Sequence, residues 1–104
     1  MESVLRAITD VIVRCCDPEE VVLFGSWAKG TAGVASDVDL LVIGAFTTSW
    51  WLRDRELRDE LRAFPVPVDL HMLTRAELAV EAARPHTYLN TLQATSRCLY
   101  RRGS

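Results

Sequence analysis

Apolar residues recur at two different spacings along the chain, and each spacing predicts one kind of element. Between residues 4 and 15 they return every three or four positions, which is typical of an amphipathic helix. Ser3 is the expected N-cap of this helix, and Asp17-Pro18 its expected end. The short runs 21–24 and 38–43 are apolar, rich in β-branched residues and followed by glycine, so both are predicted to be buried strands.

A second helix is predicted from Ser49, as its N-cap, to about Phe64. The residues expected to face inward are Trp50, Leu57, Leu61 and Phe64. Opposite charges four residues apart are expected to pair on its outer side, as Asp54/Arg58 and Arg55/Asp59.

A third strand is expected after Pro65 and Pro67, because apolar residues alternate with other residues between positions 66 and 73. This alternation puts Asp69 and His71 on the face opposite Val68. The segment 74–77 is a capping box for a short helix, and Pro85 is expected to begin another that carries Tyr88, Leu89 and Leu92. Residues 97–101 are predicted to form an edge strand, with an extension of that helix as the alternative.

The order of these elements predicts an α/β fold in which helices pack against a sheet, within one domain spanning residues 1–104. No apolar run approaches the roughly 20 residues that span a bilayer, and the N-terminus lacks the features of a secretory signal, so a soluble, cytoplasmic protein is expected. The net charge of −2 provides no broad basic surface, so no stable binding of nucleic acid is expected. Cys15, Cys16 and Cys98 are expected to be reduced and mostly packed.

Two segments carry candidate chemistry. After the first strand, Gly25-Ser26-Trp27-Ala28-Lys29-Gly30 can form a turn whose backbone N–H groups and serine hydroxyl face an anion, although a plain turn is the simpler interpretation of this segment alone. Next, Asp37 and Asp39 stand two residues apart at the beginning of an apolar strand, so both carboxylates lie on one face. Adjacent like charges repel unless a cation neutralises them, and Mg²⁺ prefers carboxylate and phosphate oxygens.

Together with Asp69, which interrupts the third strand, these segments resemble the signature of the polymerase-beta-like nucleotidyltransferases, and especially the minimal nucleotidyltransferases. The resemblance implies a small mixed sheet with helices packed against it. It also implies that Asp37, Asp39 and Asp69 are catalytic and hold two Mg²⁺ ions, and that Gly25 and Ser26 hold the phosphates of an NTP, with ATP as the donor. Lys29 stands where many relatives have arginine. Lysine keeps the positive charge but lacks the bidentate fork with which arginine contacts phosphate.

Minimal relatives are typically encoded beside a helical HEPN-domain protein, and some attach AMP to a tyrosine of that partner as antitoxins. The resemblance therefore implies a protein adenylyltransferase with a HEPN partner. A small-molecule nucleotidyltransferase and an antitoxin that only binds its partner are the alternatives. The roles of His71, Trp27, Trp50 and Trp51 stay open, as do the acceptor, the donor base and the state of homo- or hetero-oligomerisation.

Overall fold

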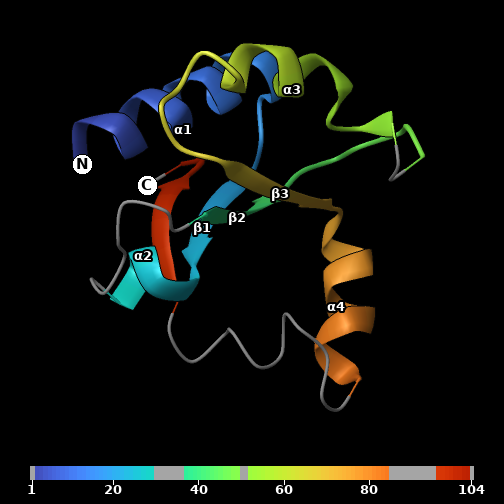
Figure 1. Ribbon diagram of the computed structural model, residues 1–104. Helices are drawn as coiled ribbons and strands as arrows, with labels where there is room; N and C mark the ends of the chain where they lie inside the picture. Colours follow the sequence, from blue (N-terminus) through green and yellow to red (C-terminus); the bar gives the residue numbers. More distant parts are fainter. Residues whose placement is uncertain (1, 30–36, 50–51, 85–95, 104) are drawn as a thin grey trace.

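The computed structural model describes residues 2–29, 37–49, 52–84 and 96–103 (Figure 1). The described helices are α1 (Glu2–Cys16), α2 (Gly25–Lys29), α3 (Arg55–Leu61) and α4 (Arg75–Ala83). The strands are β1 (Glu20–Phe24), β2 (Val38–Ile43), β3 (Val68–Leu73) and β4 (Arg97–Arg101). Of the described helices, none is long and apolar enough to cross a membrane.

The four strands form one mixed sheet in the order β3-β2-β1-β4. β1 is antiparallel to both of its neighbours, whereas β2 and β3 run parallel. The pairing of β1 with β4 is irregular between Val21 and Val22, where β4 has one extra residue opposite the step. The predicted α/β class, with a small mixed sheet and helices packed against it, is confirmed.

The two faces of the sheet are covered differently. Alternate residues of β1 and β2, such as Leu23 and Leu40, join the main core with the apolar side of α1 and with Leu57 and Leu61 of α3. Figure 1 shows α1 and α3 together over this face, with α4 on the other side of the sheet, beyond β3. The opposite face has a smaller cluster, made of Val22, Phe24, Leu41 and Ile43 with Leu73 and Leu78 at its margin. The face under α1 and α3 is therefore mostly apolar core, whereas the opposite face has room for polar side chains at the strand ends.

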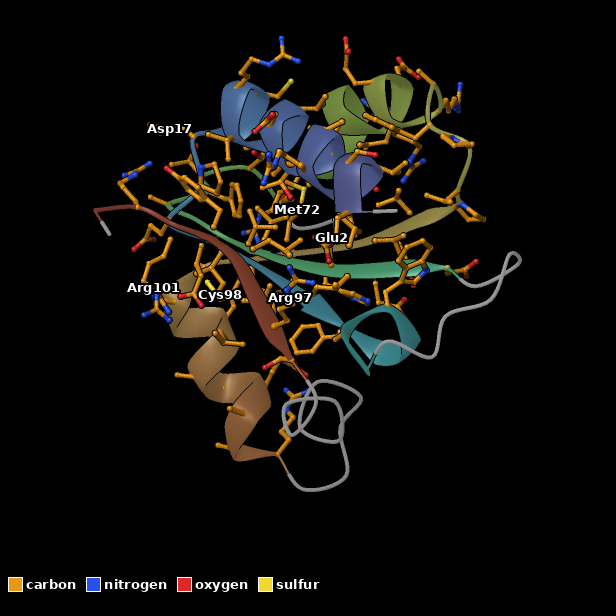
Figure 2. All side chains as sticks on the ribbon, turned by 90° about the vertical axis from the view of Figure 1, so that its left-hand side faces the viewer. Glu2, Asp17, Met72, Arg97, Cys98 and Arg101 are labelled. Atoms are coloured by element: carbon orange, nitrogen blue, oxygen red, sulfur yellow. The ribbon has the colours of Figure 1, made fainter. Side chains whose placement is uncertain are left out.

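The predicted first helix is confirmed, but its N-cap is not. α1 already includes Glu2, so Ser3 lies inside the helix and does not cap it. Its predicted end is confirmed, because the helix stops at Cys16 and Asp17 adopts a positive φ of 48° before the buried Pro18. Opposite charges also join this helix to the sheet at its other end: Arg97 Nη1 lies 2.6 Å from Glu2 Oε1, which lowers the pKa of Glu2 and raises that of Arg97 (Figure 2).

The predicted second helix is much too long. Instead of running from 49 to 64, α3 contains only residues Arg55–Leu61, with Asp54 rather than Ser49 at its N-cap position. Beyond Leu61 the N–H groups of Ala63 and Phe64 bond to carbonyls three residues back, which tightens the chain into turns before Pro65. The pair Asp54/Arg58 forms as predicted, at 2.5 Å, while Arg55/Asp59 is not among the ion pairs of the described chain. Trp50 and Trp51 lie outside the described residues.

A buried arginine accounts for the late start of α3. The Arg53 side chain is only 6% exposed, and it donates hydrogen bonds to the carbonyl oxygens of Thr48 and Met72. Its guanidinium also lies 2.5 Å from Glu77 Oε1, the same glutamate that closes the predicted capping box with Thr74 at the beginning of α4. These bonds hold residue 53 in a turn, and they link the segment after β2 to the beginning of α4.

Low pH should weaken the contacts that Glu77 makes with Arg53 and Thr74. The hydrogen bonds from Arg53 and then from the Thr74 backbone lower the pKa of Glu77 from 4.5 to about 2. Because the folded pKa is depressed, the bonds of Glu77 stabilise the fold above pH 4.5, and that stabilisation is lost as the pH falls towards 2. We expect Glu77→Gln to lower the urea midpoint at pH 6 and to lower it progressively less between pH 4.5 and pH 2. Glu60→Gln, which changes an exposed carboxylate of α3, is the control, and a constant difference from wild type at every pH would contradict the prediction.

The remaining predicted elements have mixed outcomes. The third strand is confirmed and begins at Val68, and residues 97–101 form the predicted edge strand. The expected helix from Pro85 lies outside the described residues. The cysteines are free, but Cys15 and Cys98 are exposed, so the expectation that they are mostly packed is wrong. Cys15 lies in the last turn of α1, where it lines an open hollow, and Cys98 lies on the edge strand, where packing against the core is limited.

Candidate active site

Two of the predicted aspartates stand side by side on neighbouring strands. β2 and β3 are parallel, and Asp39 is the partner of Asp69 in their register. Partners in adjacent parallel strands project their side chains to the same face of the sheet. This is the face of the smaller cluster, since Asp39 alternates with Leu41 and Ile43. Asp39 is half-buried, whereas the side chain of Asp69 is 58% exposed, so this pair of carboxylates lies where the sheet meets solvent.

Gly25 packs against the carboxylate of Asp39. β1 ends at Phe24, which is the register partner of Asp39, and α2 begins directly with Gly25. A Cβ atom built on Gly25 would lie 2.8 Å from Asp39 Oδ2, and the residue has a φ of +74°. Both the positive φ and the contact favour glycine here. The glycine therefore lets the backbone that begins α2 approach a candidate ligand carboxylate closely.

Asp37 comes two residues before Asp39 and directly precedes β2. It is exposed, and the N–H of the intervening Val38 donates to the carbonyl of Pro67 at 2.9 Å, which joins the beginnings of β2 and β3. Within the described parts of the chain, no three acidic, histidine or cysteine side chains are close enough to hold a metal ion by themselves. Mg²⁺ is commonly bound by one or two carboxylates together with substrate phosphates. An all-oxygen pair such as Asp39 and Asp69 fits that mode of binding.

His71 lies on the same face as Asp69, as the alternation of β3 predicts. Its Nε2 atom is shielded from solvent and lies 3.9 Å from Asp69 Oδ2, which is longer than a hydrogen bond. The register partner of His71 is Leu41, a member of the smaller cluster. The histidine therefore lies between that apolar cluster and the candidate carboxylates.

The segment predicted to hold phosphates does form a short helix, α2, directly after β1. Ser26 and Lys29 belong to its backbone, and their side chains lie outside what the structure describes. Trp27, whose role the sequence leaves open, is only 8% exposed and packs in the main core. Its indole therefore fixes α2 to the main-core face of the sheet.

Known proteins resemble this chain in family and in fold. Residues 8–95 match the nucleotidyltransferase domain family. A Sulfolobus solfataricus protein assigned as a nucleotidyltransferase superposes with a TM-score of 0.65 at 21% identity, over 98% of this chain and 81% of that one. A toxin-antitoxin structure with AMP-PNP gives a TM-score of 0.64 at 20% identity, over 94% and 74% of the two chains. A third structure, also assigned as a nucleotidyltransferase, gives a TM-score of 0.53 at 19% identity, over 92% and 97%.

At these identities the structural likenesses show the fold alone, and no curated protein matches the sequence. The family match is broader evidence, because it extends over most of the chain and includes α2, the two strands with the aspartates and the glycine beside them. The chain therefore belongs to the nucleotidyltransferase domain family.

Proposed function

We propose that this protein is a Mg²⁺-dependent nucleotidyltransferase that moves AMP from ATP to an acceptor hydroxyl, with Asp37, Asp39 and Asp69 as its catalytic carboxylates. The observation that carries the proposal is the register pairing of Asp39 with Asp69, with Gly25 packed against Asp39. A pure binding module has no use for carboxylates placed side by side, because they repel each other until a cation is present. Family membership gives this acidic pair its chemical context.

In the proposed reaction the acceptor oxygen forms a bond to the α-phosphorus of ATP, and the bond from that phosphorus to the bridging oxygen breaks, so pyrophosphate leaves. Asp37 and Asp39 would hold the cations that carry the triphosphate. Asp69 would hold one of these cations, orient the acceptor hydroxyl and accept its proton. Bound Mg²⁺ would neutralise the charge on the phosphates and align the entering and leaving oxygens. Gly25 and Ser26 hold the terminal phosphates through the backbone that begins α2, and Lys29 adds a positive charge near them.

The proposed acceptor is a tyrosine of a HEPN-domain partner protein, which would make this chain an antitoxin. A structural neighbour that is a toxin-antitoxin with AMP-PNP supports a partner protein and an adenine nucleotide. The decisive experiment incubates the protein with Mg²⁺, each labelled NTP and the product of the adjacent gene, followed by mass spectrometry of the partner. A mass increase of one AMP on a tyrosine is expected. Label on small molecules only would favour the small-molecule alternative, and neutralisation without any transfer would favour the binding-only antitoxin.

Magnesium and the nucleotide should stabilise the protein jointly. Triphosphate oxygens and aspartate oxygens complete the coordination of the same ions, so each ligand strengthens the binding of the other. At about ten times the dissociation constant, the melting temperature should rise by roughly 6–11 °C for a domain of this size. The measurement is a thermal titration with ATP, Mg²⁺ or both. Shifts that merely add, or that persist in Asp39→Asn, would argue against a shared site for metal and nucleotide.

A further inference from the structure

A cavity of about 540 Å³ lies at the other end of the strands from the aspartates. It opens where the chain leaves β2, and its described lining includes Cys15 and Cys16 at the end of α1 together with Phe46, Leu52 and Met72. Asp39 is separated from the last residue of β2 by about 13 Å of strand. Figure 2 shows Met72 on the α1 side of the sheet, which is not the face of the aspartates. The proposed nucleotide site therefore does not use this cavity.

The lining combines an apolar floor with positive charge. Met72 is 7% exposed and belongs to the main core, Phe46 packs against that core, and Leu52 at the margin is 36% exposed, one of the two large apolar side chains most open to solvent in the described chain. Arg55 also lines the cavity. It is exposed and joins no ion pair within the described residues, in contrast to Arg53, whose charge is compensated by Glu77.

None of the described lining residues is acidic, so nothing among them neutralises Arg55. A cation at the margin of an apolar hollow complements a ligand with one negative charge and an apolar body. The volume is within the range of roughly 300–1,000 Å³ that is usual for small-molecule sites. We propose that this cavity binds a small organic monoanion, a carboxylate or sulfonate on an aromatic or aliphatic body, with the anion at Arg55 and the body against Phe46 and Leu52.

The test uses two probes that share one ring system and differ in charge. 8-Anilinonaphthalene-1-sulfonate carries the anion, and N-phenyl-1-naphthylamine lacks it. Fluorescence titration of Arg55→Gln should show about five- to tenfold weaker binding of the anionic probe and no change for the neutral one. Leu52→Ser should weaken both probes about threefold, since it removes apolar contact area. Arg58→Gln, one turn further along α3 and outside the cavity lining, is the matched control and should change neither.

The position is checked by cysteine protection. Cys15 lines the cavity, whereas Cys98 is also exposed but lies on β4, so the two thiols serve as reporter and internal reference. Saturating anionic probe should slow alkylation of Cys15 by iodoacetamide at least threefold, as measured by peptide mass spectrometry, and should leave Cys98 unchanged. Equal protection of both thiols, unchanged affinity in Arg55→Gln, or displacement of the probe by Mg²⁺ with ATP would each overturn the proposal. Because no readout depends on transfer, the result is independent of the proposed catalytic activity.

Discussion

Replacing Asp39 with asparagine is expected to reduce nucleotide transfer by about 10²–10³-fold or more while the protein stays folded. Asparagine keeps the shape of the side chain but removes its charge, so cation binding and stabilisation of the transferring phosphoryl group are both weakened. The carboxylate stands beside that of Asp69 in the register of β2 and β3. Relief of this repulsion should leave the melting temperature of the metal-free variant equal to that of wild type or slightly higher.

The measurement compares three properties of wild type and Asp39→Asn. These are thermal melting, co-purification with the product of the adjacent gene, and transfer of AMP to that product, detected by mass spectrometry. Asp10→Asn is a matched control, because Asp10 is an exposed aspartate of α1 on the helical layer that covers the other face of the sheet. It should behave as wild type in all three assays. If Asp39→Asn still neutralises the partner in cells at wild-type strength, the enzymatic antitoxin hypothesis is wrong and the binding-only alternative replaces it.

The bounds of β2 and the face that Asp69 shares with His71 follow from patterns that are local in the sequence. β2 has the predicted bounds, because a run of six residues that is apolar except for Asp39 and is followed by Gly44 is typical of a buried strand. Alternation in β3 correctly puts Asp69 and His71 on one face. Which strand lies beside which, and in what register, depends on contacts between distant residues. Local patterns alone therefore do not predict that Asp39 and Asp69 are neighbours, and the register of β2 and β3 shows that they are.

The failures have a common physical cause. The long helix predicted from Ser49 has good periodicity, but Arg53 is held by Thr48, Met72 and Glu77, and this network of bonds from distant residues overrides local propensity. Nothing in the spacing of charges marks an arginine that will be buried. The cavity beyond β2 likewise cannot be predicted from local patterns, since its lining comes from the end of α1, the segment between β2 and α3, the start of α3 and the inner face of β3.

Gly25→Ala should both destabilise the fold and disturb the acidic site. An alanine at a φ of +74° is strained, which costs about 1–2 kcal/mol of unfolding free energy. In addition, its Cβ would lie 2.8 Å from Asp39 Oδ2, so either the carboxylate or the beginning of α2 must shift. A shift of about 1 Å in such a group can reduce catalysis by about 10²-fold. We therefore expect transfer to fall far more than the loss of stability alone would explain.

Gly103→Ala separates the two effects, because Gly103 has a similar φ of +82° but no atom within 4 Å of the added Cβ. It should carry the backbone strain alone. Urea unfolding measures the stability of each variant. Mn²⁺ binding and AMP transfer, measured under conditions in which both variants are folded, report on the acidic site. Gly103→Ala should retain full Mn²⁺ affinity and transfer, and Gly25→Ala should lose both. Equal retention of Mn²⁺ binding by the two variants would mean that contact with Gly25 does not position Asp39.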